Sequence, residues 1–254
     1  MLDGAVANRM LRFNVARGVA LPRVGRAERH FLAAEQVDEL AEAIGERYGA
    51  LVYVLAYGGL RFGEAVALRR KRCELLRRRL RIEEAATEVG ANLIWGSPKT
   101  HAVRSVSLPP FVVQELAHHL EAVEDTPDAL VFTAPVSGGP LRNSDFRRYV
   151  WKPAVRAAGL PGALTPHELR HTAASLLIAQ GANPKSIQAH LGHSTITTTF
   201  DLYGHLFEGH LDDVMGQLDA AHRSRGTAPR RPHDDDGEGA EVIEFDIGEA
   251  ATGR

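Results

Sequence analysis

The sequence predicts a mainly α-helical protein with a small three-stranded antiparallel sheet, an α+β fold. Apolar residues recur at steps of three and four over much of the chain, which is the period of an amphipathic helix. Between about residues 79 and 108 the period falls toward two, which is typical of strands. With 44% hydrophobic residues, a chain of 254 residues can bury a core in one large domain or two small ones.

Punctuating residues mark several helix ends. The pair Gly58-Gly59 predicts a turn, Pro109 suits the first turn of a helix, and Gly181 suits a C-terminal stop. The expected helices cover residues 5–13, 31–44, 50–57, a stretch from about 61, 109–123, 144–158, 166–180, 184–191, 195–202 and 205–221. The expected strands lie near residues 80–82, 93–95 and 103–107, with a turn at 96–100 between the last two and an extended piece at 130–132.

Bulk properties exclude some classes of protein. The single cysteine, Cys73, excludes a disulfide framework and suits a reducing compartment. No run approaches eighteen consecutive apolar residues, and the N-terminus lacks the apolar region of a signal peptide. We therefore expect a cytoplasmic, nucleoid-associated protein.

The net charge of −2 hides an uneven distribution. Residues 222–254 hold eight acids and five bases, and we expect most of this tail to be disordered. Two basic runs, Arg69–Arg72 and Arg77–Arg81, form a dense block elsewhere. As a group they favour contact with DNA phosphates.

Four short motifs bring together unusual chemistry. They are Gly58–Glu64 (GGLRFGE), Thr165–His171 (TPHELRH), Leu191–Ser194 (LGHS) and Tyr203. Two guanidinium groups, several imidazoles and a phenol make a poor metal site. They make a good phosphodiester site, because cations can hold the anionic oxygens while one nucleophile attacks.

This ordered set of motifs resembles the tyrosine recombinases, also called phage-type integrases, over roughly residues 30–220. The resemblance implies the catalytic-domain fold of that family and site-specific cleavage and rejoining of DNA through a 3′-phosphotyrosine. Covalent linkage preserves the energy of the phosphodiester, so neither metal nor ATP nor another cofactor is expected.

The residue types suggest a different role for each candidate. Arg61 and Arg170 would bind the phosphate, because guanidinium is a planar fork that stays charged. Tyr203 would be the nucleophile, and its phenol, with an ordinary pKa near ~10, needs activation. The resemblance adds His167 for proton transfer, His193 as a phosphate donor and Lys99 as the acid for the leaving 5′-oxygen.

Two neighbours are expected to be structural. His171 lies one turn after His167, but apolar residues around it suggest burial and a structural hydrogen bond. Glu64 is expected to pair with a basic neighbour and hold its helix.

The resemblance also implies domains and partners. Residues 1–27 are expected to be the last helix of a core-binding domain with its linker, residues 28–222 the catalytic domain, and residues 223–254 an acidic tail. The expected partners are double-stranded DNA, further copies of the chain in a tetramer, and accessory DNA-bending or directionality factors. Residues 205–221 are the segment expected to dock on a neighbouring subunit.

Two alternatives remain open. The chain could be a non-autonomous piece of an integrase that binds DNA or a partner without recombining it. His167–His171 also matches HExxH, the zinc-protease helix, with Asp201 as a conceivable third ligand. The residues that follow do not match the extended metzincin pattern.

Overall fold

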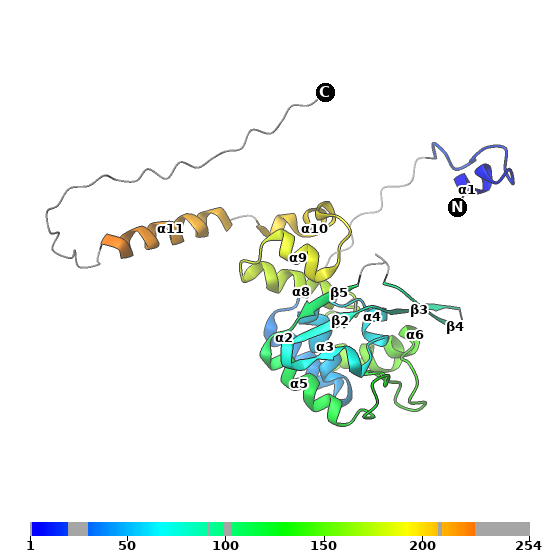
Figure 1. The fold of residues 1–254 in the computed structure, drawn as a ribbon, viewed down its shortest axis with the longest axis horizontal. Coiled ribbons are helices and arrows are strands. Elements are labelled where there is room, and N and C mark those ends of the chain that lie inside the picture. The colour runs from blue at the N-terminus through cyan, green and yellow to red at the C-terminus, as the bar shows by residue number, and fades with distance from the viewer. Residues whose placement is uncertain (1, 20–29, 91, 99–102, 208–209, 227–254) are drawn as a thin grey trace. The chain divides into compact units, whose positions relative to one another are not determined.

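The computed structural model describes residues 2–19, 30–90, 92–98, 103–207 and 210–226 (Figure 1). Contacts divide the chain into a unit Met1–Phe207 and a unit Glu208–Arg254. The described part of the second unit is the helix α11, His210–Gly226. The candidate site residues that the structure describes all belong to the first unit.

Helices make up most of the first unit. Their bounds are α1 Leu2–Ala7, α2 Ala34–Ile44, α3 Glu46–Gly58, α4 Phe62–Val66, α5 Pro110–Glu121, α6 Asn143–Phe146, α7 Lys152–Ala157, α8 Glu168–Ala179, α9 Pro184–Leu191 and α10 Ile196–Tyr203. A π-helical turn, Arg147–Trp151, joins α6 to α7, and short 3₁₀ turns lie at Arg70–Arg72, Leu75–Arg77 and Gly204–Phe207. None of the described helices is long and apolar enough to cross a membrane.

The main core forms around α3. This helix is apolar on most of its surface, with Leu51, Val52, Val54 and Leu55 fully buried, because α2, α5 and α8 all pack against it. An all-round apolar helix is typical of a helix in the middle of a fold. Burying those side chains stabilises the fold by roughly 1.5–3 kcal/mol each, and it fixes the Gly58–Glu64 segment that leaves the end of α3.

Two small antiparallel sheets lie beside the helices. One has the order β1 (Cys73–Glu74), β2 (Arg79–Ile82), β5 (Arg104–Ser107), and β2 aligns Leu80 with Val106. The other pairs β3 (Ala85–Val89) with β4 (Asn92–Gly96). Leu80, Ile82 and Val106 are buried while their strand neighbours are exposed or partly exposed, which is the period of two expected for strands with one covered face.

The mainly α fold with small antiparallel sheets confirms the predicted fold class. The strand pairing differs from the prediction, because β4 pairs with β3 and not with β5. The sequence pattern does not predict β3, because its two alanines favour strands only weakly. The expected three-stranded sheet exists, but β1 and not β4 supplies its third strand.

The first helix is also shorter than predicted. It ends at Ala7 instead of continuing to residue 13. Arg9 takes a left-handed φ of 59°, which a helix does not continue through. Asn14 then donates a hydrogen bond of 2.9 Å to Asp3 and folds the segment back on its helix.

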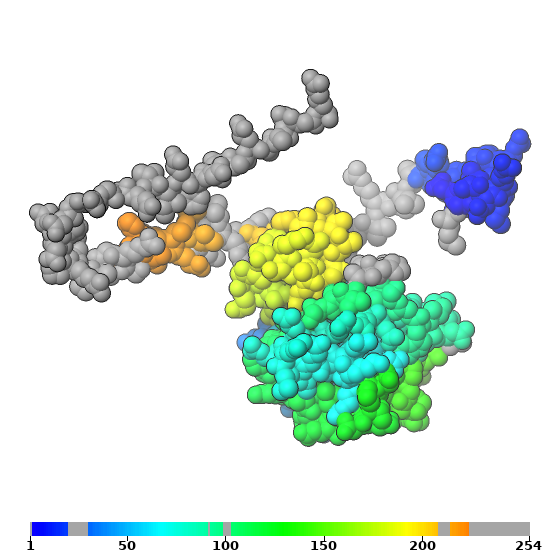
Figure 2. Space-filling model, viewed as in Figure 1, coloured from blue at the N-terminus to red at the C-terminus, as the bar shows by residue number. Residues whose placement is uncertain are grey.

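The last three helices of the first unit, α8 to α10, share a second apolar cluster. Its buried members include Ala173, Ile178, Ile187, Leu191 and Tyr203. Helix α9 also contacts β5, and Figure 2 shows the yellow surface of this part of the chain beside the cyan and green surface of the residues before it. Asn183 and Thr195 cap α9 and α10 by accepting bonds from Ser186 N and Thr198 N. These caps set the directions from which the last motifs approach the end of α3.

Candidate active site

The turn after α3 forms the base of the site. Gly59 ends the helix with a left-handed φ of 63°, a conformation that favours glycine. A Cβ on Gly59 would lie 2.5 Å from Leu191 Cδ2, so the absence of a side chain also lets α9 approach. The motifs around Gly59 and Gly192 therefore meet although about 130 residues separate them in sequence.

Arg61 is held by Glu64 on one side and by the Gly192 turn on the other. Glu64 accepts 2.8 Å from the Arg61 backbone N–H and 3.0 Å from its guanidinium. The same guanidinium donates 3.5 Å to the Gly192 carbonyl oxygen. Arg61 remains partly exposed, so it can still reach a phosphate that arrives from solvent.

Arg104, on β5, is a further arginine that the sequence analysis did not single out. It donates 2.9 and 2.7 Å to the two carboxylate oxygens of Glu64, a bidentate geometry, and 3.3 Å to the His190 carbonyl oxygen. Its side chain is 9% exposed. The alternation of β5 gave a signal for this inward position, but no motif did.

Glu64 thus bridges two guanidinium groups while only 1% exposed. Burial raises the pKa of Glu64, but its hydrogen bonds and the charges of Arg104 and Arg61 outweigh this effect and leave the pKa below its ordinary value. Glu64 is therefore ionised at neutral pH. The expectation that it pairs with a basic neighbour agrees with this geometry.

Arg170 is the most enclosed cation of the site, at 2% exposed. Its guanidinium donates 2.5 Å to the Gly59 carbonyl oxygen and 2.6 Å to the Leu191 carbonyl oxygen. Burial, followed by repulsion from Arg61, lowers the pKa of Arg170 to about 9. The group therefore stays charged at neutral pH, and two bonds do not exhaust the donors of a guanidinium.

His193 follows the left-handed turn at Gly192 and lies near these cations. Its Nδ1 is 3.0 Å from Thr199 Oγ1. Burial, then the charges of Arg170 and Arg61, lowers the pKa of His193 to about 4. The imidazole is therefore neutral at pH 7, and in the tautomer whose Nδ1 accepts from Thr199 the Nε2–H is a donor.

Tyr203 lies between two of the histidines and is fully buried. Its ring stacks on His193 with 6.3 Å between centroids, and its phenol oxygen is 2.8 Å from His171 Nδ1. His167 is the N-cap residue just before α8, is exposed, and contacts the ring of His171 edge-on at 5.2 Å.

The structure therefore brings together five of the six predicted site residues: Arg61, His167, Arg170, His193 and Tyr203. The sixth, Lys99, lies outside the described residues. The site also contains Arg104, Thr199 and the phenol-bonded His171. Sequence reasoning missed the first two and expected only a structural hydrogen bond for the third.

The basic block around residue 70 behaves differently from the site. Arg69 pairs with Glu84, Arg70 with Asp125, Lys71 with Asp128 and Arg72 with Glu83. Each cation of this run thus has an acidic partner that offsets its charge. At the site, three guanidinium groups surround one carboxylate, which leaves an excess of positive charge there.

In the described part of the chain, no third zinc ligand joins His167 and His171 of the HExxH motif. No group of three or more His, Cys, Asp or Glu side chains gathers there with a geometry fit for a metal ion. Glu168, the general base of that reading, instead accepts a hydrogen bond from the Thr165 backbone N–H. This bond ties the first residue of α8 to the turn that precedes the helix.

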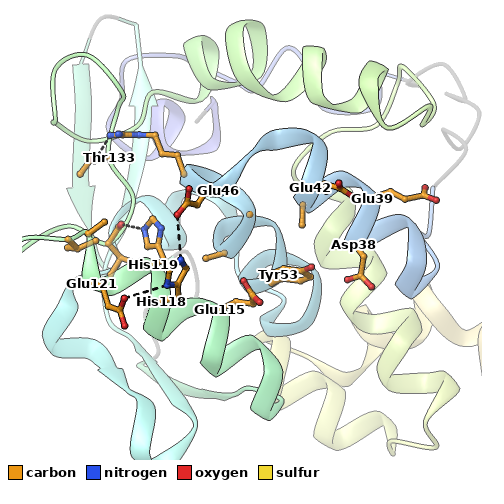
Figure 3. A pocket seen from close by; sticks show the side chains of 17 residues that line it. Asp38, Glu39, Glu42, Glu46, Tyr53, Glu115, His118, His119, Glu121 and Thr133 are labelled. Carbon is orange, nitrogen blue, oxygen red and sulfur yellow. Dashed lines mark hydrogen bonds and ion pairs between the residues drawn. The ribbon is translucent and has the colours of Figure 1, made fainter.

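A wide pocket of about 1020 Å³ lies elsewhere, among α2, α3 and α5 (Figure 3). Carboxylates dominate its charged lining, and His118 contacts Glu46 and Glu121 at 3.5 Å each. None of the described candidate residues lines it. Its negative charge would repel a phosphate, so the pocket is a poor site for DNA.

Comparisons with known proteins show the family of the chain. Residues 30–210 match the model of the phage integrase family. The chain is 30% identical over 201 residues to the integrase of Mycobacterium phage L5, covering 77% of this chain and 53% of that protein. It is 28% identical over 229 residues to the tyrosine recombinase XerC of Yersinia pestis, covering 87% and 69%.

Solved structures share the fold. The Tn1549 transposon integrase, in complex with transposon right end DNA, aligns with a TM-score of 0.68 at 22% identity over 85% of this chain and 75% of that one. The XerA recombinase aligns with a TM-score of 0.59 at 26% identity over 76% and 66%. The chain spans about half the length of the mycobacteriophage integrases it matches. The match over residues 30–210 places the chain in the phage integrase family of tyrosine recombinases.

Proposed function

We propose that this chain cleaves and rejoins double-stranded DNA as a site-specific recombinase, through a 3′-phosphotyrosine on Tyr203 and without metal or ATP. The observation that carries the proposal is the meeting of Arg61, Arg170, His193 and Tyr203 at the ends of α3, α9 and α10. An integrase and a recombinase with the same fold support it.

Two arginines act on the phosphate. Arg61 and Arg170 bind the non-bridging oxygens, where negative charge grows as a fifth oxygen bonds to phosphorus. Because both guanidinium groups are held by carbonyl or carboxylate oxygens before DNA arrives, little reorganisation is needed. Glu64 and Arg104 act indirectly by keeping Arg61 and the Gly192 turn in position.

The remaining groups handle the nucleophile and protons. Tyr203 attacks phosphorus, and neutral His193 donates Nε2–H to a phosphate oxygen. His167 assists proton transfer and phosphate binding, and Lys99 protonates the leaving 5′-oxygen. The reverse reaction, with a new 5′-hydroxyl, rejoins the strand at no cost in ATP.

The assembly belongs to the same proposal. Copies of the chain act as a tetramer on two DNA sites, with accessory DNA-bending or directionality factors. The helix α11 docks on a neighbouring copy, and its exposed Val214, Met215 and Leu218 provide the apolar face. A non-recombining chain that only binds DNA or a partner is the competing function, since the match covers about half of the phage integrases.

The decisive experiment is relaxation of a supercoiled plasmid in EDTA, followed by detergent trapping of covalent protein–DNA adducts. Tyr203→Phe is the test variant, and Tyr149→Phe, at a tyrosine that is 64% exposed, is the matched control. We expect an adduct from the wild type and Tyr149→Phe only. An adduct from Tyr203→Phe would refute the assigned nucleophile, and DNA binding without any adduct would favour the competing function.

A further inference from the structure

The phenol of Tyr203 and the ring of His171 form a direct pair. His171 Nδ1 lies 2.8 Å from the phenol oxygen, and the two ring centroids are 5.7 Å apart. His167, the histidine that the family resemblance links to proton transfer, is exposed and contacts His171. The imidazole beside the attacking atom is therefore His171.

Helix geometry explains why this pair forms. His171 lies on α8, one turn after His167 at the N-cap, so the two rings lie on the same side of the helix start. Tyr203 is the last residue of α10, which packs on α9, and α9 packs on α8. The cluster of α8–α10 thus aims the phenol at His171.

Burial makes the pair important for Tyr203. The tyrosine is fully buried in the apolar cluster that contains Ala173, Ile178 and Leu191. A buried hydroxyl is destabilising without a hydrogen bond, and a neutral acceptor such as a carbonyl would be enough to satisfy it. The partner here is instead a group that can take a proton, next in sequence to Arg170.

We propose that His171 is a catalytic residue that accepts the phenolic hydrogen bond of Tyr203 at Nδ1 and takes that proton as the phenol attacks. The proposal rests on the function proposed above and deepens it. His167 still binds the phosphate, and it assists the proton transfer through its contact with the ring of His171. The proposal requires that resting His171 carry its proton on Nε2.

The bond between Tyr203 Oη and phosphorus forms while the bond between phosphorus and O5′ breaks. The Oη proton moves to His171 Nδ1, and the leaving O5′ receives a proton from Lys99, as in the proposed function. Rejoining reverses both transfers, so His171 returns to the neutral form.

The resting pair can be tested without DNA. Long-range ¹H–¹⁵N spectra at one constant pH report which ring nitrogen of His171 is protonated. We expect a protonated Nε2 and an unprotonated Nδ1, whose signal moves in Tyr203→Phe while that of His119 does not. A proton on Nδ1, or no movement in Tyr203→Phe, would overturn the proposal.

The transfer itself is tested by the rate of adduct formation in the plasmid assay. His171→Asn keeps a hydrogen-bonding group near the Nδ1 position but cannot take a proton, and His171→Ala removes both functions. We expect both variants to form the adduct about 10²–10⁴-fold more slowly than the wild type. His119→Gln is the control, because His119 is a remote, partly buried histidine bonded 2.7 Å from the Val131 carbonyl oxygen.

The outcomes separate the two proposals. An active wild type with His171→Asn at an equal rate would overturn the role of His171 alone. A wild type that forms no adduct would remove the proposed function, and the catalytic role of His171 with it. Thermal unfolding of each variant shows whether slow adduct formation by His171→Ala results from a loss of folded protein. If it does, the rate for His171→Asn tests the catalytic role of His171.

Discussion

At the scale of single residues, the buried carboxylate of Glu64 organises the cations. Glu64→Ala should destabilise the fold by about 3–5 kcal/mol, because it leaves Arg104 buried without its ion-pair partner. Urea unfolding measures the change. Glu84→Ala is the control, because Glu84 pairs with Arg69 and its side chain is 49% exposed. This variant should lose no more than about 1 kcal/mol of stability. Equal effects of the two variants would contradict the central role of Glu64.

A second residue-scale prediction concerns pH. The pKa of His193 falls from 6.5 to about 4 in the folded chain, first by burial and then by Arg170. Between these two values the unfolded chain binds more protons, so the contribution of His193 to stability is complete above pH 6.5 and is lost as pH falls toward 4. Burial also lowers the pKa values of His119 and His190, so the wild type has several such contributions.

The measurement therefore compares how steeply the stability of two proteins falls with decreasing pH. When the pH is lowered from 7 to 4.5, His193→Gln should lose less stability than the wild type. The midpoint of urea unfolding measures this loss. Identical midpoint shifts in both proteins would show that His193 does not titrate as the geometry implies.

At the scale of elements, Gly63 joins α4 to β3. Alanine usually favours a helix over glycine by about 1 kcal/mol. A Cβ on Gly63 would nevertheless lie 2.3 Å from the Ala86 carbonyl oxygen, which belongs to backbone and cannot swing aside. Gly63→Ala should therefore destabilise the fold by roughly 1–3 kcal/mol, measured by thermal unfolding.

The matched control is Gly162→Ala, because a Cβ there meets no atom within 4 Å. Its stability should stay within about 0.5 kcal/mol of the wild type. A stabilised Gly63→Ala would mean that α4 and β3 are farther apart than described.

At the scale of the whole molecule, charge is divided between the site and the C-terminal tail. The eight acids of residues 222–254 oppose the cations that would meet DNA. Replacing these acids with Asn and Gln keeps the length of the tail and removes its competition. DNA affinity at low salt should then rise, and the gain should shrink as added salt screens the charges.

Filter binding or fluorescence anisotropy over a salt series measures this effect. Removal of residues 223–254 should give a similar gain. Unchanged affinity in both variants at low salt would show that the tail does not compete with DNA.

The sequence by itself determined the family motifs, most helix positions and the fold class. These follow from local periods, caps and turns, as at Gly59, Asn183 and the apolar stretch of α3. The same local rules failed at β3, whose alanines conceal a strand beside β4, and where partners are distant. Arg70 and Lys71 pair with Asp125 and Asp128, and these pairs depend on which segments fold against each other.

Only the tertiary structure determined the charges and the protonation states of the site residues. Arg104 meets Glu64 across 40 residues, and Arg170 reaches the Gly59 carbonyl oxygen across 111. Burial among these charges keeps His193 neutral and gives Tyr203 an imidazole partner, His171, that sequence reasoning treats as structural. Desolvation and Coulomb interaction depend on distance in space, and a linear sequence does not contain those distances.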